Sequence, residues 1–400
     1  MHLHLSDDDC RFRDEVRAFI AANLTPEMRA AGRAATSIFV DPAHSLPWQR
    51  ALNARGWAAP GWPAAHGGPG WSGMQRHIFA AECARAGAPP LAPMGLRMIG
   101  PILMHHGSAA QQAHYLPRIL SGEDYWCQGF SEPGAGSDLA ALQLRADGDG
   151  EDYVLNGSKI WTTHAHFANR MFCLVRTARE GRPQAGISFL LLDMASPGIA
   201  VDPIVTLAGE HELNQVFFTD VRVPKANRLG AENDGWAVAK SLLAFERGGG
   251  AGPGLKAFLL RLSEIAAREP GELGQAPGSD PAMARRLAQA EIMVQAVAMS
   301  EDRLLSALAE GHSPGPASSL LKTRATEAVQ ALDELAVDLA GLAACRWPAA
   351  AAGTGDNAPD VARDEAQWVT ARFLNNRAAS IYGGSNEIQR GIMARAMLGL

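Results

Sequence analysis

Residues Cys127 to Asp138 read CQGFSEPGAGSD, a composition that suits neither a helix nor the interior of a strand. Gly134 and Gly136 permit positive φ angles and let a ligand approach bare backbone. Ser131 and Ser137 add hydroxyl donors, and the exposed amides of such a turn can form a nest for an anion. The stretch therefore predicts either a cradle for a ligand or a tight surface turn ahead of a strand.

The overall composition indicates an ordinary globular protein with more than one packed region. Its 400 residues exceed the usual size of a single core, so two or three packed regions are expected. The formal net charge of −6 argues against a nucleic-acid partner, which normally requires a basic face. No apolar run approaches the roughly 20 residues that span a bilayer, so no membrane span is expected.

The cysteines and histidines do not form a metal-binding pattern. The five cysteines lack CxxC spacing, which argues against a disulfide framework or a thiolate zinc site and favours a reducing cytoplasm. His164 and His166 form an HxH pair with no further ligand cluster, and HExxH does not occur. We therefore expect a cytoplasmic protein and no metal site.

The hydrophobic pattern changes character twice along the chain. Helical three-four spacing fills residues 1–123 and returns in residues 231–400. Residues 124–230 have a period close to two and are rich in β-formers. This order predicts an α+β fold in which a central antiparallel β domain separates a helical N-terminal domain from a C-terminal helical bundle domain.

Individual elements are also expected within these three domains. Asn156-Gly157 is a strong hairpin signal between YVL and KIWTT, and Asp147 to Asp152 (DGDGED) predicts a second, polar turn. Ser6 and Asp7 are candidate caps of the first helix. The expected helices lie at residues 12–23, 48–55, 75–86, 94–106, 109–120, 235–245, 281–308, 317–342, 362–379 and 387–398.

A second stretch with possible chemistry is KIWTT, from Lys159 to Thr163. Trp161 is a large apolar plate, and in a strand Thr163 would present a hydroxyl on the same face. A flat aromatic cofactor could stack on the first side chain and hydrogen-bond to the second. The alternative is a tryptophan buried in the core of the β domain.

A third stretch, LLAFERGGG, ends an apolar helical segment with an acid and an arginine. Apolar surroundings would raise the pKa of Glu246 and suit it to act as a base. The alternative is an ordinary pair at a helix end, where Arg247 complements the C-terminal dipole.

The fourth stretch is IYGGSNEIQR, from Ile381 to Arg390. Ser385 or Asn386 can cap the last helix, whose free N–H groups could hold an anion or polarise a carbonyl. The alternative is a plain turn between helices.

In order and spacing, the four stretches resemble the acyl-CoA dehydrogenase family over nearly the whole chain. GWPAAHGG, DGWAVAK and FFTDVRVP add to the resemblance. It implies a C-terminal four-helix bundle behind the β domain, with FAD bound between the two. It also implies α,β-dehydrogenation of an acyl-CoA thioester to the trans-2-enoyl-CoA, in which a glutamate removes the α-proton and the β-hydrogen passes as hydride to flavin N5.

The resemblance implies roles for single residues as well. The glycine-rich stretch would lie against the flavin and the cofactor phosphates, Trp161 would flank the flavin and Thr163 would bond to its N5 edge. The implied cofactor-binding residues are Gln128, Phe130, Ser131, Ser137, Trp161, Thr163, Ser385 and Glu387, and the implied substrate-binding residues are Ser137, Arg247, Tyr382 and Gly383.

The position of the catalytic base departs from the commonest family pattern. Many members carry the glutamate in a YEG sequence where this chain has Gly383, whereas a minority, including isovaleryl-type enzymes, place it in the helix that holds Glu246. The resemblance therefore implies that Glu246 is the base and that the Gly383 N–H is free to bond to the thioester carbonyl.

Two segments, residues 274–284 and 340–345, match the family's intersubunit cofactor contacts poorly. Two alternatives follow: a non-catalytic or half-site subunit of a heteromeric acyl-CoA dehydrogenase, and a flavin oxidase or monooxygenase of the family. Runs such as GISFLLLDM look closest to bacterial pimeloyl-CoA dehydrogenase large subunits and to steroid- and terpenoid-CoA dehydrogenases. The implied partners are an acyl-CoA, an electron-transfer flavoprotein as acceptor, and further subunits in a homo- or heterotetramer or a dimer.

Overall fold

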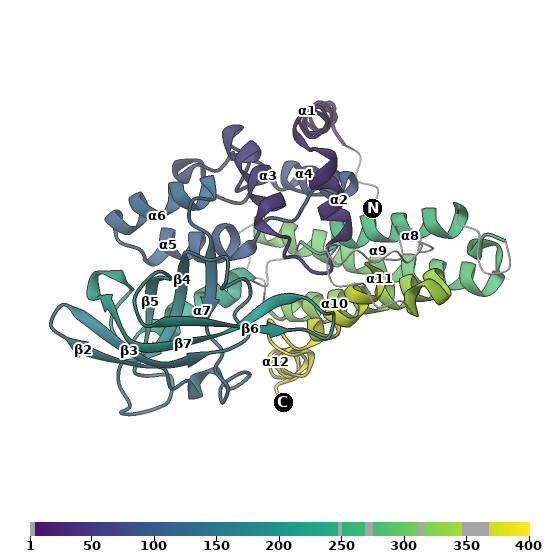
Figure 1. Cartoon of the computed structure of the whole chain (residues 1–400). Coiled ribbons are helices and arrows are strands. Elements are labelled where there is room, and N and C mark those ends of the chain that lie inside the picture. The colour runs from purple at the N-terminus through teal and green to yellow at the C-terminus, as the bar shows by residue number, and fades with distance from the viewer. Residues whose placement is uncertain (1–4, 247–249, 269–274, 310–314, 346–367) are drawn as a thin grey trace, which may run out of the picture.

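The computed structural model describes residues 5–246, 250–268, 275–309, 315–345 and 368–400. A helical N-terminal part, a central sheet and a set of long C-terminal helices follow one another along the chain (Figure 1). The expected α+β fold class is therefore confirmed. In the described ranges, no helix is both long enough and apolar enough to cross a membrane.

The N-terminal helices begin at local signals in the sequence. The side chains of Ser6, Thr25, Asp41, Ser72 and Ser108 each accept a hydrogen bond from a backbone N–H of the first helical turn. This confirms the expected helices of this part, while α2 was not predicted. The helices are α1 (Asp7–Asn23), α2 (Pro26–Ala34), α3 (Pro42–Ala54), α4 (Gly73–Ala86), the π-helical turn η2 (Met94–Ile99), α5 (Gly100–His106) and α6 (Ala109–Ser121).

The central strands form one mixed sheet, so the prediction of a purely antiparallel domain is wrong. Strands β6, β7, β3, β2, β4, β5 and β8 lie in that order, and β1 pairs with β4 in parallel. Parallel neighbours need a long crossover, which residues 130–169 supply. The strands are β1 (Trp126–Gly129), β2 (Arg145–Asp149), β3 (Asp152–Lys159), β4 (Arg170–Arg176), β5 (Ile187–Asp193), β6 (Ile199–Val205), β7 (His211–Pro224) and β8 (Arg228–Leu229).

The hairpin predicted at Asn156-Gly157 does not form. Strand β3 runs through both residues and pairs with β7 on the far side, with a register shift between Leu155 and Gly157. Gly157 has a φ of 145°, and a Cβ there would lie 3.0 Å from Leu144 Cδ1, so the glycine serves a bulge and not a turn. The chain instead reverses between β2 and β3, within the predicted polar turn, where Gly150 has a φ of 57°.

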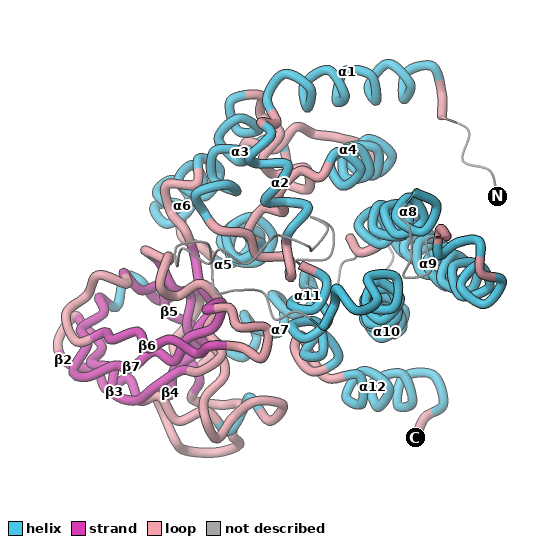
Figure 2. Tube along the Cα trace, turned by 45° about the vertical axis from the view of Figure 1, so that its right-hand side comes forward, coloured by secondary structure: helices cyan, strands magenta, loops and turns pink. Residues whose placement is uncertain are grey.

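Strand β4 is buried on both faces, which fixes the sheet between two apolar layers. Met171 and Cys173 belong to a cluster inside the β region, whereas Phe172 and Leu174 belong to a cluster shared with the N-terminal helices and α7 (Gly235–Glu246). Figure 2 shows the sheet beside these helices. Alternate side chains of one strand thus join the β region to the helical part.

The C-terminal part is built on a separate apolar core. Helices α8, α9 and α10 share this core, and α11 and α12 pack against α10. Helix α8 was not predicted, and its first residues are Gly252, Pro253 and Gly254. Of the helix expected at 362–379, residues 362–367 lie outside the described part. The helices are α8 (Gly252–Arg268), α9 (Pro281–Ala309), α10 (Gly315–Ala340), α11 (Val369–Asn375) and α12 (Asn386–Leu398).

Helix α7 approaches the sheet closely through its first residue, Gly235. A Cβ there would lie 2.5 Å from the carbonyl carbon of Ser188 and 2.6 Å from the backbone nitrogen of Phe189, both in β5. We expect Gly235→Ala to lower the free energy of unfolding by about 1–3 kcal/mol, because α7 must move off the sheet. Chemical denaturation measures this change.

Gly254→Ala is the matched control for this prediction. Gly254 lies in α8, and a Cβ there would meet no atom within 4 Å. Alanine favours a helix over glycine, so this variant is expected to be neutral or up to about 1 kcal/mol more stable. Equal losses at both positions would contradict the packing argument.

Candidate active site

The glycine loop, residues 130–138, follows β1 directly and is held by its first residues. Phe130 is buried, with its ring edge-on to Phe172 and Phe189 at centroid distances of 5.7 and 6.0 Å. Gln128 in β1 and Ser131 are half-buried, whereas Ser137 is exposed. A Cβ at Gly134 or at Gly136 would meet no atom within 4 Å, so this part of the loop has an open face.

A buried ion pair joins Glu132 of the glycine loop to Lys159 at the end of β3, and the sequence did not single it out. The Nζ of Lys159 donates to the carbonyl oxygen of Phe130 at 3.0 Å and to Oε1 of Glu132 at 2.8 Å. The Glu132 carboxylate also accepts from the backbone N–H groups of Gln143 and Leu144 at 2.5 and 2.8 Å. A lysine in the apolar alternation of β3 is the sequence signal that could have revealed the pair.

The segment that contains Trp161 and Thr163 joins the glycine loop through Ile160. Contrary to the prediction, neither residue lies on a strand. Strand β3 ends at Lys159, and Trp161 has a φ of 61° and a side chain that is 56% exposed. The Ile160 N–H donates to the carbonyl oxygen of Ser131 at 2.9 Å, which joins the two segments. Positive φ is energetically costly for a bulky residue. The surrounding fold must therefore stabilise this conformation, in which the indole side chain is exposed. Thr163 is half-buried.

The HxH pair belongs to a cluster of polar rings near this segment. His164 Nδ1 lies 2.7 Å from the hydroxyl of Tyr125, and His166 stacks on His211 with ring centroids 3.9 Å apart. Asn214 bonds to both His166 and His211. Across the described part of the chain, no group of three or more His, Cys, Asp and Glu side chains is arranged to hold a metal ion.

The burial of His164 makes stability depend on pH. Burial and the neighbouring His166 lower the pKa of His164 to about 4, from the ordinary 6.5. Between pH 6.5 and 4 the unfolded chain binds a proton that the native chain does not, so acidification lowers the free energy of unfolding. The contribution of this group is about 3 kcal/mol over that interval.

We therefore expect His164→Asn to flatten the fall in stability between pH 6.5 and 4, as measured by denaturation at a series of pH values. Asparagine tolerates the φ of 56° at this position and keeps a polar atom near Tyr125. The control is His114→Asn, which changes an exposed imidazole on α6. An unchanged slope in the His164 variant would contradict this account.

Glu246 is the last residue of α7, and its side chain, like the whole of Arg247, lies outside the described part. Helix α7 packs against β5, α5 and η2, so both the sheet and the N-terminal helices fix its position. After the helix, the N–H groups of Gly250 and Gly252 donate to the buried carboxylate of Glu301, the second at 2.6 Å. Burial raises the pKa of Glu301.

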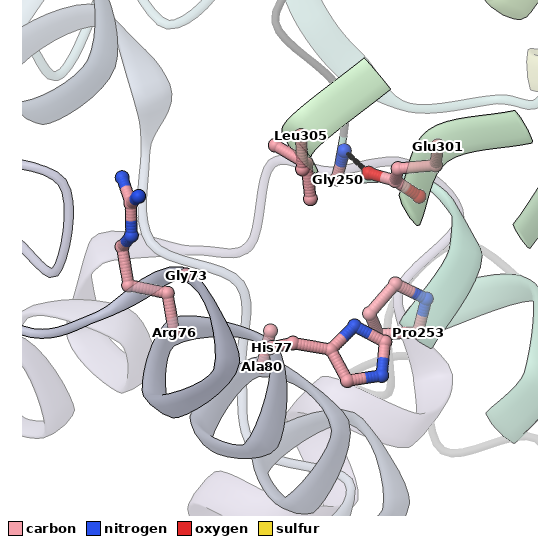
Figure 3. Close-up of a pocket in the computed structure, with 8 residues that line it drawn as sticks. All are labelled: Gly73, Arg76, His77, Ala80, Gly250, Pro253, Glu301 and Leu305. Atoms are coloured by element: carbon pink, nitrogen blue, oxygen red, sulfur yellow. Dashed lines mark hydrogen bonds between the residues drawn. The ribbon is translucent and has the colours of Figure 1, made fainter. Parts of the chain in front are cut away.

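A cavity adjoins this connection between α4, α8 and α9 (Figure 3). His77 in its wall lies 3.5 Å from Asp302, from Nδ1 to Oδ1. None of the lining residues belongs to the predicted site, so the cavity marks a helix junction and not the glycine loop. The lining residues are Gly73, Arg76, His77, Ala80, Gly250, Pro253, Glu301 and Leu305.

The turn before α12 contains the remaining predicted residues. Gly383 and Gly384 have φ angles of 65° and 81°, and Ser385 caps α12 by accepting from the Ile388 N–H at 3.3 Å, as expected. The side chain of Gln389 donates to the Gly383 carbonyl oxygen at 3.2 Å and holds the turn in place.

Tyr382 in this turn and Glu387 in the first turn of α12 are both exposed to solvent, the tyrosine with 56% of its surface. Among the described residues, no hydrogen bond joins the turn to the glycine loop. The structure therefore brings together the loop and the segment of Trp161, and places the turn before α12 on the C-terminal helices. Asn375 of α11 reaches β7 at Glu212, over 3.4 Å.

Comparison with known proteins identifies the family. The N-terminal, middle and C-terminal domain models of acyl-CoA dehydrogenases match residues 6–123, 127–221 and 233–398. Acyl-CoA dehydrogenase IpdE1 of Mycobacterium tuberculosis (strain ATCC 25618 / H37Rv) is 37% identical over 401 residues, covering 97% of either chain.

Two solved structures are similar along their whole length. The steroid ACAD Tcur3481-Tcur3483 superposes with a TM-score of 0.84 at 28% identity, and the ChsE4-ChsE5 complex from Mycobacterium tuberculosis with a TM-score of 0.82 at 30% identity. Each match covers 100% of this chain and 99% of the other. The chain therefore belongs to the acyl-CoA dehydrogenase family, which are oxidoreductases acting on CH–CH groups.

Proposed function

We propose that the protein is an FAD-dependent dehydrogenase that converts an acyl-CoA thioester to the trans-2-enoyl-CoA. The observation that carries this proposal is the exposed indole of Trp161, held at positive φ beside an open glycine loop. An exposed aromatic plate next to bare backbone suits a flat, phosphate-bearing cofactor. Residues 1–123, 124–230 and 231–400 are the domains of this proposal.

The residues around the loop fit FAD. Trp161 offers a stacking surface, Thr163 and Ser131 offer polar atoms at its edge, and exposed Ser137 suits a phosphate or the CoA moiety. When bound, FAD accepts the hydride that leaves the β-carbon. The proposed cofactor residues at the loop are Gln128, Phe130, Ser131, Ser137, Trp161 and Thr163. Ser385 and Glu387, at the start of α12, are proposed for the adenosine side of the same cofactor.

The proton step is assigned to Glu246 at the end of α7. An α-proton is only weakly acidic, so its removal needs both a base and donors that stabilise charge developing on the thioester oxygen. In the turn before α12, Gly383 has no side chain and its N–H can serve as such a donor. Arg247, Tyr382 and Ser137 are the other proposed substrate residues.

The proposals for the substrate and the assembly draw on similar proteins. One similar structure is described as a steroid ACAD, and another as a complex of two named chains. We propose a bulky or ω-functionalised acyl-CoA as substrate, an electron-transfer flavoprotein as acceptor, and a homo- or heterotetramer or a dimer. A cytoplasmic location fits the five cysteines, which are all free thiols.

Anaerobic titration of the purified, FAD-loaded chain with a panel of acyl-CoA thioesters tests the proposal. Bleaching of the flavin absorption band by at least one thioester is the expected result. Bleaching that requires a partner chain would instead indicate a half-site subunit, and rapid reaction of the reduced flavin with oxygen would indicate an oxidase. A chain that retains no FAD alone or with a partner would contradict the assignment.

A further inference from the structure

We infer that Lys159 and Glu132 are positioning residues, which orient the peptide between Phe130 and Ser131 so that the Ser131 N–H faces the cofactor side of the glycine loop. The inference rests on the proposed function, because it concerns how this chain holds FAD. It assigns a role to two buried charged residues, Glu132 within the loop and Lys159 at the end of β3, whose side chains do not lie on the open face of the loop.

The burial of the pair is the first observation. Lys159 is 0% exposed and Glu132 is 8% exposed. Moving such ions out of water costs several kcal/mol each, which is repaid only where geometry and hydrogen bonding are excellent. Here Oε1 of Glu132 accepts from Lys159 Nζ and from the Leu144 N–H, and Oε2 accepts from the Gln143 N–H. The ammonium donates to two oxygens, Oε1 of Glu132 and the Phe130 carbonyl.

The direction of the Phe130 carbonyl is the second observation. It accepts from the buried ammonium of Lys159 at 3.0 Å and therefore points inward. The chain contains no cis peptide bond among the described residues. Across a trans peptide the N–H points opposite to the C=O, so the Ser131 N–H points away from Lys159 and out of the protein interior.

The same segment also fixes the next peptide. The Ile160 N–H, one residue after Lys159, donates to the Ser131 carbonyl oxygen at 2.9 Å. The Phe130 ring itself packs edge-on against two buried phenylalanines, Phe172 and Phe189. The end of β3 thus fixes the orientation of two successive peptides of the loop, those that follow Phe130 and Ser131. The same residues lead directly to Trp161.

Stability alone does not require charges at these positions. Replacing a buried ion pair by apolar residues of similar volume is often neutral or stabilising, whereas removing one partner leaves an uncompensated charge. What an apolar residue cannot do is donate to the Phe130 carbonyl. The pair is therefore explained by the peptide that it orients.

The test uses the double variant Lys159→Met with Glu132→Gln, which removes both charges and leaves none unpaired. The FAD-loaded proteins are diluted, and the dissociation constant is measured from the fluorescence of released FAD. We expect the double variant to keep its melting temperature within a few degrees and to bind FAD about tenfold or more weakly, the equivalent of about 1.4 kcal/mol.

The matched control is Lys225→Met. Lys225 also donates from Nζ to a backbone carbonyl, that of Gly150 at 2.6 Å, but in the exposed turn between β2 and β3. This variant is expected to keep the FAD affinity of the parent protein.

A folded double variant with unchanged FAD affinity would overturn the inference. So would a double variant that cannot fold, because the pair would then be a requirement of the fold itself. If the parent protein retains no FAD, the proposed function fails, and this outcome is separate from both.

Discussion

Replacement of Glu246 by glutamine is expected to lower the rate of acyl-CoA-dependent flavin reduction by about 10²–10⁴-fold, the usual contribution of a general base. Glutamine keeps the size and polarity of the side chain but cannot accept the α-proton. The substrate dissociation constant is expected to change little, because the loss concerns the transition state. Stopped-flow reduction of the FAD-loaded variant under anaerobic conditions measures both quantities.

Glu264→Gln is the control for this variant. Glu264 is an exposed glutamate on α8, so the same chemical change there should leave the reduction rate unaltered. A Glu246→Gln variant that reduces its flavin at nearly the parent rate would show that the base lies elsewhere.

Replacement of Asp333 by alanine is expected to lower the free energy of unfolding by about 3–5 kcal/mol. The change removes the buried carboxylate that pairs with the Arg372 guanidinium and leaves that charge without its partner. Asp333 on α10 is 1% exposed. Its two oxygens accept from Arg372 Nε and from Asn376 Nδ2, each at 2.7 Å, and so tie α11 and the turn after it to α10. Denaturation with urea, followed by circular dichroism, measures the loss.

Asp338→Ala on the same helix provides the comparison. Asp338 forms an ion pair with Arg286, but both side chains are nearly half exposed. Such surface pairs contribute about 0–1 kcal/mol, so this variant should remain close to the parent protein. Similar losses for Asp333 and Asp338 would contradict the view that burial sets the cost.

Except for α2, the N-terminal helices could be predicted because their signals are local. Ser6, Ser72 and Ser108 cap helices within three residues of their own position, and the apolar spacing continues directly from each cap. The strand direction in the sheet could not be predicted in this way. The pairing of β1 with β4 depends on how a long intervening segment returns, which no local pattern records.

The hairpin error arose because Asn156-Gly157 was taken for the turn that it most often makes. Gly157 allows a bulge as readily as a hairpin, and the partner strand β7 decides between them. Helix α8 was not predicted, although proline, as at Pro253, is well tolerated in the first turn of a helix.

The candidate site was predictable where its residues are recognisable by type and order along the sequence. Trp161 and the glycine loop are recognisable as residue types in order, and the structure places them side by side through Ile160 and Ser131. The Lys159–Glu132 pair was not recognised, because its meaning depends on burial and on a contact between distant residues. The roles of Glu246 and of the turn before α12 stay predictions.

The parallel pairing of β1 with β4 has a consequence for how the protein reaches its native state. Trp126 pairs with Arg170, and the loop, the ion pair and Trp161 all lie in the segment that this pairing encloses. Contacts between residues far apart in the sequence require a large loss of chain entropy to close the intervening loop, so they tend to form slowly. We therefore expect the glycine loop and its indole neighbour to be assembled late in folding, so that ligand capture at this place would report on completion of the sheet.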